Sequence, residues 1–132
     1  MPTTVFGEIL AHCLAGLPDE ACGLIAGDAA SGSVLRWYPT RNAAASAKLY
    51  EVDPRDLLRA DRDAESSGTE LIGVVHSHTH TGAYPSPTDV VQAPDPAWHY
   101  VLVSLRDTHP AMRSYRIVGG RISEELLALE SR

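Results

Sequence analysis

The sequence predicts an α/β domain in which one mixed β-sheet packs against helices. Apolar residues near the start recur at three- and four-residue steps, a pattern typical of a helix with one buried face. Short β-branched and apolar runs follow, and helical and strand-like segments alternate along the chain. The chain has 132 residues, 44% of them hydrophobic, which is enough for one core. We therefore expect a single domain over residues 1–132.

The first helix is expected over residues 5–17, because its apolar positions share one face. Gly16 and Pro18 are residues that end a helix. The apolar run over residues 21–26 then has the length and composition of a buried strand. Glu20 therefore lies where a helix is followed by a strand.

Two further strands are expected over residues 34–39 and 48–52, with a polar, alanine-rich loop between them. Asp53 can cap a second helix that has Pro54 at its first position and breaks at Gly68. The apolar side of this helix is expected to contain Leu57, Leu58 and Ala60.

The second half of the chain is expected to be mostly strands. Residues 71–75 form the clearest one, and residues 100–105 and 114–118 have the same β-branched and apolar character. Gly119-Gly120 supplies the two positive-φ positions of a tight hairpin. Residues 121–129 should continue as a strand or a short helix.

Composition excludes several classes of protein. A formal charge of −6 argues against binding to nucleic acid through a basic surface. No apolar run approaches the ~20 residues that span a bilayer, and the N-terminal segment lacks the features of a secretory signal. We expect a cytoplasmic protein that does not bind membranes. Cys13 and Cys22 are too few for a disulfide framework or a thiolate zinc site, so both are expected to be buried.

The segment VVHSHTHTGAYPSPTD carries the pattern of a metal site. His76 and His78 are two residues apart at the end of a predicted strand, so both imidazoles face the same side. Asp89 follows a loop that contains glycine and proline, and its carboxylate can return to complete three ligands. Three protein ligands leave a fourth position for water, which distinguishes a catalytic Zn²⁺ site from a closed structural one.

Three neighbouring residues have roles that the spacing leaves open. Glu20 is the leading candidate for the base that activates the bound water, although its position by itself favours a surface residue of a helix-ending turn. Ser86 could cap a short helix, donate its hydroxyl to an oxyanion, or do both. His80 would face the same side as His76 and His78 if the strand continued, and could then be a third imidazole ligand.

These residues resemble the JAMM metalloprotease family, the catalytically competent MPN domains. The family pattern is an upstream Glu, His-x-His, ten residues and Asp, with Ser three residues before the Asp, and all five positions match. The segments PDEACGLIAG and AYPSPTD also look like the family, although Thr79 stands where many members have proline. The resemblance implies a cytidine-deaminase-like fold with a mixed, curved β-sheet flanked by helices. It also implies an amide or isopeptide hydrolase.

The resemblance also implies a role for each residue of the motif. The implied Zn²⁺ ligands are His76, His78 and Asp89. Glu20 would be the general acid/base, and Ser86 would support the oxyanion.

Within the family, the stretches HYVLVSLRD and RSYRIV are similar to a small bacterial branch. That branch releases L-cysteine from the C-terminus of the ubiquitin-like sulfur carrier CysO in cysteine biosynthesis. The implied partner is thus a ubiquitin-like sulfur carrier protein with a Gly-Gly tail, which a sheet edge could bind by strand addition. Alternatives are a deubiquitinase-like isopeptidase, a carrier-precursor peptidase and a non-catalytic MPN scaffold. The sequence leaves a homodimer open.

Overall fold

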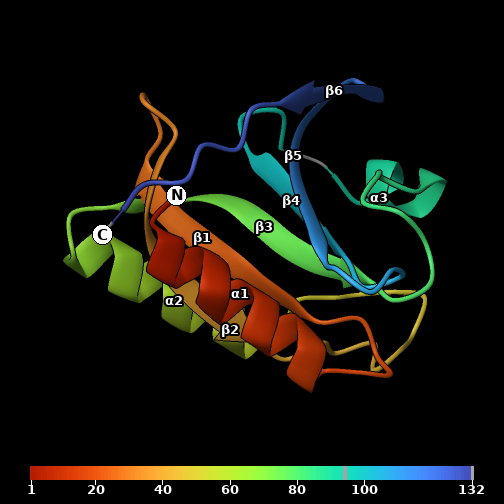
Figure 1. The fold of residues 1–132 in the computed structure, drawn as a ribbon. Helices are drawn as coiled ribbons and strands as arrows, with labels where there is room; N and C mark the ends of the chain where they lie inside the picture. The colour runs from red at the N-terminus through yellow and green to blue at the C-terminus, as the bar shows by residue number, and fades with distance from the viewer. Residues whose placement is uncertain (94, 132) are drawn as a thin grey trace.

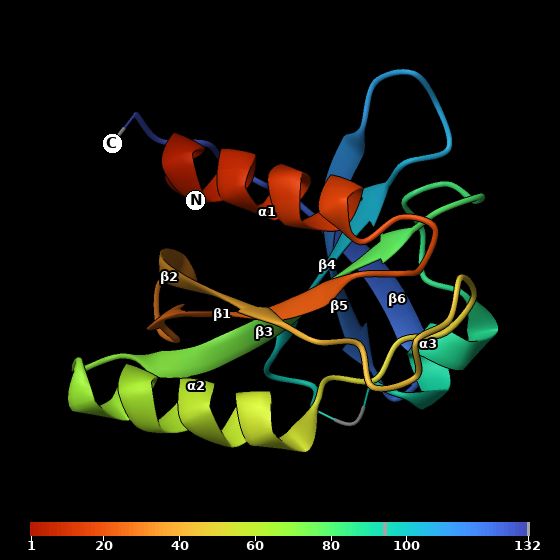
Figure 2. The ribbon, with the colours of Figure 1, turned by 90° about the horizontal axis from the view of Figure 1, so that it is seen from below.

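The computed structural model describes residues 1–93 and 95–131 and has the expected α/β architecture (Figure 1). One β-sheet lies between two long helices, and a short third helix stands at one end of the central strands (Figure 2). In chain order the elements are α1 (Thr3–Ala15), β1 (Cys22–Asp28), β2 (Ser33–Thr40), α2 (Pro54–Ser66), β3 (Glu70–His78), α3 (Pro87–Val91), β4 (His99–Ser104), β5 (Ala111–Val118) and β6 (Arg121–Glu125).

The sheet is mixed, with strand order β2-β1-β3-β4-β5-β6. Neighbouring strands are antiparallel except for the central pair β3 and β4, which is parallel. His78 at the end of β3 lies opposite Ser104 at the end of β4. Because both strands end at the same edge of the sheet, the loops that follow them meet there.

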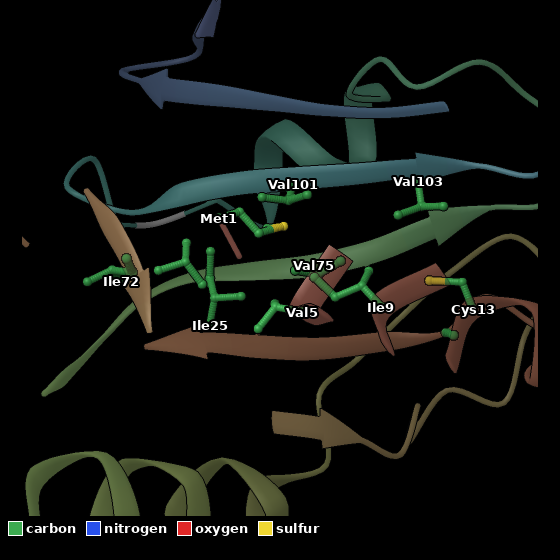
Figure 3. Packing of buried hydrophobic residues seen from close by; sticks show 11 residues of the cluster. Met1, Val5, Ile9, Cys13, Ile25, Ile72, Val75, Val101 and Val103 are labelled. Atoms are coloured by element: carbon green, nitrogen blue, oxygen red, sulfur yellow. The ribbon is translucent and has the colours of Figure 1, made fainter. Parts of the chain in front are cut away.

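Helix α1 covers one face of the sheet with a closed apolar layer (Figure 3). Ile9 and Cys13 of the helix are fully buried and belong to the same cluster as Val75, Val101 and Val103 of the central strands. Burial of apolar side chains at about 25 cal/mol per Å² makes this layer a main source of folding free energy. The expected burial of both cysteines is confirmed, since Cys22 is 1% exposed.

Helix α2 covers the opposite face, where Ala60 packs with Leu24, Val74 and Tyr100. Side chains of a strand alternate between the two faces, and from Val74 onward the even-numbered residues of β3 face α2, whereas Ile72, at the register shift against β1, packs in the α1 cluster. His76 follows Val74 in this alternation. The candidate metal ligands of β3 therefore lie on the α2 face of the sheet.

The local signals for caps and turns are confirmed. The Asp53 side chain accepts hydrogen bonds from the backbone N–H groups of Arg55 and Asp56, at 2.9 and 3.2 Å, and so caps α2. Gly119 and Gly120 have φ angles of 56° and 79°, as the hairpin between β5 and β6 requires.

The prediction of a strand over residues 48–52 is wrong. These residues belong to the loop between β2 and α2, where only Val52 forms an isolated bridge, with Asn42. The Asn42 side chain accepts hydrogen bonds from the N–H groups of Ala44 and Glu51 and donates to the Leu49 carbonyl. The side chain of Asn42 thus forms the hydrogen bonds that the backbone of a neighbouring strand would otherwise provide to this segment.

Two smaller expectations are met only in part. Leu58 is 51% exposed, because α2 buries the small side chains of Ala60 and Ala64 against the sheet instead. Residues 121–129 form a strand only as far as Glu125. No helix in the described part of the chain is long and apolar enough to cross a membrane.

Candidate active site

The site lies at the carboxyl end of β3, where two imidazoles converge as the spacing predicts. His76 is 2% exposed and His78 is 4% exposed. Their Nε2 atoms are 3.3 Å apart. The alternation of side chains along β3 therefore places two candidate metal-ligating nitrogens on one side of the sheet.

Asp89 reaches the two histidines because α3 begins with a capping box. The Ser86 hydroxyl accepts a hydrogen bond from the Asp89 N–H at 3.1 Å, and Asp89 Oδ2 accepts one from the Ser86 N–H at 2.8 Å. The carboxylate also lies 3.2 Å from His76 Nε2 through Oδ1 and 2.9 Å from His78 Nε2 through Oδ2. The same short helix thus holds Ser86 and Asp89, and the predicted cap at Ser86 is present.

The three donor groups fit a tetrahedral metal ion. Ligands about 2.0–2.1 Å from a tetrahedral Zn²⁺ are separated from one another by about 3.3 Å. The two Nε2 atoms are 3.3 Å apart, and each lies 2.9 to 3.2 Å from the nearer oxygen of the Asp89 carboxylate, Oδ1 for His76 and Oδ2 for His78. Among the described residues, this is the one group of three or more His, Cys, Asp or Glu side chains with such geometry.

Each imidazole is held by a further contact. His78 Nδ1 lies 2.9 Å from the Gly82 carbonyl, and donation of its proton there leaves the lone pair of Nε2 for a metal. The His76 ring stacks on Tyr50, with ring centroids 4.0 Å apart and an interplanar angle of 16°. These contacts fix the direction in which both nitrogens point.

The charges of the group also suit metal binding. Burial lowers the pKa of His76, which favours the neutral imidazole. Burial alone would raise the pKa of Asp89, but hydrogen bonds from His76 and His78 outweigh it and hold the pKa far below its usual range. For His78, burial lowers the pKa, but the contacts with Asp89 and Gly82 raise it overall, so a metal ion would have to displace the proton that this imidazole shares with Asp89. Neutral imidazole and ionised carboxylate are the forms that bind a divalent ion.

Glu20 is buried beside this group and is not the surface residue that the sequence left as an alternative. The residue is 6% exposed. The Glu20 N–H donates to the Ser46 carbonyl at 2.8 Å, and the Glu20 carbonyl accepts from Asn42 Nδ2 at 2.8 Å. The next N–H, that of Ala21, donates to the hydroxyl of Ser77, which lies between the two histidines. Glu20 is thus attached to the loop before α2 and to β3.

The environment of Glu20 raises its pKa to about 7. Burial is the largest cause, and the negative charge of Asp89 acts in the same direction, whereas His78 lowers the pKa. A carboxyl group with a pKa near neutrality can both accept and return a proton at neutral pH. Glu20 therefore has the burial and the proton affinity of a general acid/base.

His80 does not join the group. Strand β3 ends at His78, and the His80 side chain is exposed and bonded to the Thr79 hydroxyl at 2.8 Å. The same hydroxyl donates to the Ala47 carbonyl at 3.1 Å. The residue that replaces the proline common in the family therefore attaches the loop before α2 to the end of β3.

A hollow of about 580 Å³ lies next to the site on the α2 face. Its lining is mainly apolar and includes Tyr50, whose ring also stacks on His76. The sequence pattern does not indicate a role in the site for Tyr50, Asn42 or Ser77. Tyr50 was assigned to a strand, and neither polar residue has a local signal, because their partners lie far away along the chain.

Comparison with known families decides the assignment. The family described as prokaryotic homologs of the JAB domain matches residues 2–118. The chain belongs to the prokaryotic JAB domain family. Proteins similar to this chain include the CysO-cysteine peptidase of Mycobacterium tuberculosis, which is 45% identical over 118 residues that cover 89% of this chain and 81% of the relative. The desampylase of Haloferax volcanii is 35% identical over 102 residues, which cover 74% of this chain and 73% of the relative.

Solved structures agree with this assignment. A protein from Desulfitobacterium hafniense has a TM-score of 0.89 and 34% identity, with 100% of this chain and 94% of that one covered. A JAB1/MPN domain protein from Archaeoglobus fulgidus has a TM-score of 0.60, 17% identity and coverage of 95% and 92%, and shows the same fold. The family match and the two curated relatives, rather than these structures, indicate a JAMM-type hydrolase, and the scaffold alternative is not retained.

Proposed function

We propose that this JAB domain is a zinc-dependent hydrolase that releases L-cysteine from the C-terminus of a ubiquitin-like sulfur carrier protein. The observation that carries the proposal is the convergence of His76, His78 and Asp89 next to the buried Glu20. The substrate class rests on the likeness to the mycobacterial CysO-cysteine peptidase.

Zinc is the metal that suits this donor set. Two imidazoles and one carboxylate are ligands of catalytic zinc sites, and the three leave one tetrahedral position open. When bound, zinc supplies a Lewis acid that polarises a carbonyl group and lowers the pKa of water. The capping box and the Gly82 carbonyl hold Asp89 and His78 in place for this ion.

Glu20 would move the proton during hydrolysis. Water adds across the amide bond, so its oxygen joins the carbonyl carbon of the carrier and the leaving nitrogen gains a proton. Glu20 accepts the proton from the attacking water and delivers it to that nitrogen. The carrier leaves with a free carboxylate, and cysteine leaves with a free amino group.

Ser86 would stabilise the negative charge that develops on the carbonyl oxygen. Its oxygen already accepts a hydrogen bond from the Asp89 N–H, which fixes its position. The O–H proton remains able to donate to an oxyanion. The cap and the catalytic donor are thus two uses of one hydroxyl group.

The recessed site favours a narrow substrate. His76, His78 and Glu20 are at most 6% exposed, so a reacting carbonyl group must enter between surrounding side chains. A Gly-Gly tail has no side chains and occupies less space than any other dipeptide. This geometry supports a carrier whose flexible C-terminal tail carries the scissile bond.

The test compares three substrates with the zinc-loaded protein. These are a carrier–cysteine adduct, an isopeptide-linked conjugate and a carrier precursor with a C-terminal extension. Mass spectrometry of the carrier and a thiol assay on the protein-free filtrate follow the reaction, with chelator-treated protein as the control. We expect the fastest cleavage with the cysteine adduct. Absence of cysteine release by metal-loaded protein would overturn the proposal.

An isopeptidase is the second candidate. The likeness to the Haloferax volcanii desampylase favours a JAMM hydrolase that acts on another substrate. Both candidates use the same five residues, so only the leaving group separates them. Preferential cleavage of the isopeptide-linked conjugate in the same assay would select this second candidate.

A further inference from the structure

A half-exposed arginine lies at the same edge of the sheet as the candidate metal site. Arg106 comes two residues after the end of β4, and β4 is parallel to the strand that carries the histidines. The N–H of Leu105, the preceding residue, donates to the His78 carbonyl at 2.9 Å. The loop that carries Arg106 is therefore attached directly to a candidate metal ligand.

The guanidinium group of Arg106 packs on Gly82. A Cβ atom at Gly82 would lie 3.5 to 3.8 Å from three guanidinium atoms. The carbonyl of Gly82 is also the group that accepts the Nδ1 proton of His78. One glycine therefore separates the positive charge from the metal-ligating histidine, and the missing side chain leaves the guanidinium accessible.

A buried serine fixes the relative position of the two loops. Ser104 is 4% exposed, and its hydroxyl donates to the Thr81 carbonyl at 2.6 Å. The same oxygen accepts a hydrogen bond from the Arg106 N–H at 3.3 Å. The backbones next to Gly82 and Arg106 are thus joined through one buried side chain.

Arg106 keeps most of its binding capacity. Arg41 is bound to Asp56, and Arg113 is bound to Glu124 at 2.8 Å. In the described part of the chain, Arg106 forms one ion pair, with Asp107 at 3.4 Å, and both side chains are more than half exposed. Such a pair contributes little, and a guanidinium has five N–H donors.

The expected leaving group needs a cation. Cysteine joined through its amino group keeps a free α-carboxylate close to the scissile nitrogen, whereas a lysine in an isopeptide bond does not. The site already contains the acidic Glu20 and Asp89, and the chain has a formal charge of −6. Bound zinc would offset the charges of Glu20 and Asp89, and a further cation on the leaving-group side would pair with the additional α-carboxylate that the substrate brings in.

From this arrangement we infer that Arg106 binds the α-carboxylate of the leaving amino acid and selects substrates with a single residue beyond the scissile bond. The inference rests on the proposed function and specifies its leaving-group side. A charge-assisted, bidentate contact between guanidinium and carboxylate would orient the leaving residue. Arg106 would thus determine specificity, whereas the metal ligands and Glu20 carry out the hydrolysis.

The experiment removes the carboxylate and the arginine separately. The zinc-loaded protein is given carrier–cysteine and carrier–cysteinamide, which differ only at the terminal carboxylate. We expect the wild type to prefer the free carboxylate by about 10- to 100-fold in kcat/KM. Arg106→Gln should lose this preference and still cleave the amide at the wild-type rate, while Arg106→Lys should keep part of it. Arg113→Gln, which removes another cation on the same half of the sheet, should retain the full preference.

Two results would overturn the role of Arg106 and leave the proposed function intact. One is equal cleavage of both adducts by the wild type, and the other is an unchanged preference in Arg106→Gln. Failure of metal-loaded wild type to cleave either carrier adduct would instead overturn the proposed function. Zinc content and far-UV circular dichroism of each variant show that the metal site and the fold are retained.

Discussion

The two faces of β3 show how one strand serves both stability and chemistry. On the α1 face, Val75 belongs to a closed apolar cluster, and Ser77 exchanges hydrogen bonds with Ala21. On the α2 face, the same strand ends with His76 and His78 beside a hollow. Alternation along the strand separates the two tasks by a single residue. Substitutions on one face should therefore change metal binding and turnover, and those on the other should change mainly the free energy of unfolding.

The largest effect is expected for His78→Ala on the α2 face. The change removes one of three ligands, and the remaining His76 and Asp89 cannot form a stable zinc site. We expect loss of bound metal and at least a ~10³-fold loss of kcat/KM. Metal analysis by mass spectrometry and the cysteine-release assay check this. Stoichiometric zinc in the variant would show that His78 is not a ligand.

Glu20→Gln should separate turnover from metal binding. The glutamine has a similar shape but cannot accept the proton of water, so kcat should fall by about 10²- to 10⁴-fold while the zinc content stays the same. Both quantities are measured on the same preparation. If the variant turned over at the wild-type rate, the proton-transfer role of Glu20 would be wrong.

Val75→Ala tests the other face of the strand. Val75 is fully buried under α1, so truncation should lower the free energy of unfolding by about 2 kcal/mol. Zinc content and kcat/KM should stay close to wild type in conditions where the variant is folded. Urea unfolding monitored by circular dichroism measures the change. A drop in zinc affinity as large as that of His78→Ala would show that the two faces are not independent.

The sequence was sufficient wherever the signal was local or periodic. Alternation placed His76 and His78 on one side, and the serine-proline start of α3 indicated the cap that holds Asp89. The strands of the sheet core followed from β-branched runs, and Gly119-Gly120 identified the last hairpin. In each case the residues that determine the structure are close together in the sequence.

The remainder depends on contacts between distant segments. The burial of Glu20 follows from hydrogen bonds with Asn42 and Ser46, and no local pattern distinguishes this arrangement from an exposed turn. Hydrogen bonds with the same Asn42 hold residues 48–52 as a loop, although their composition favours a strand. Tyr50 became part of the site only because that loop brings its ring onto His76. The mistaken predictions thus arise mainly where a polar side chain forms hydrogen bonds with backbone groups that are distant in the sequence.

The smallest expected effect concerns the free energy of unfolding of chelator-treated protein, which should depend on pH because Glu20 is buried. The folded state raises the pKa of Glu20 from 4.5 to about 7, so folded protein binds more protons than unfolded protein between these values. The contribution of Glu20 to stability is then fully present below about pH 4.5 and is lost as the pH rises through about 7.

Glu20→Gln removes this titration. Because other groups contribute equally to both proteins, the difference in unfolding free energy between variant and wild type isolates Glu20. We expect the variant to gain about 1 kcal/mol relative to wild type from about pH 6 to about pH 8, measured by urea unfolding. With zinc bound, the cation favours the charged carboxylate, and the gain should shrink. A difference that stays constant with pH in the metal-free proteins would mean that Glu20 titrates as an exposed carboxyl group.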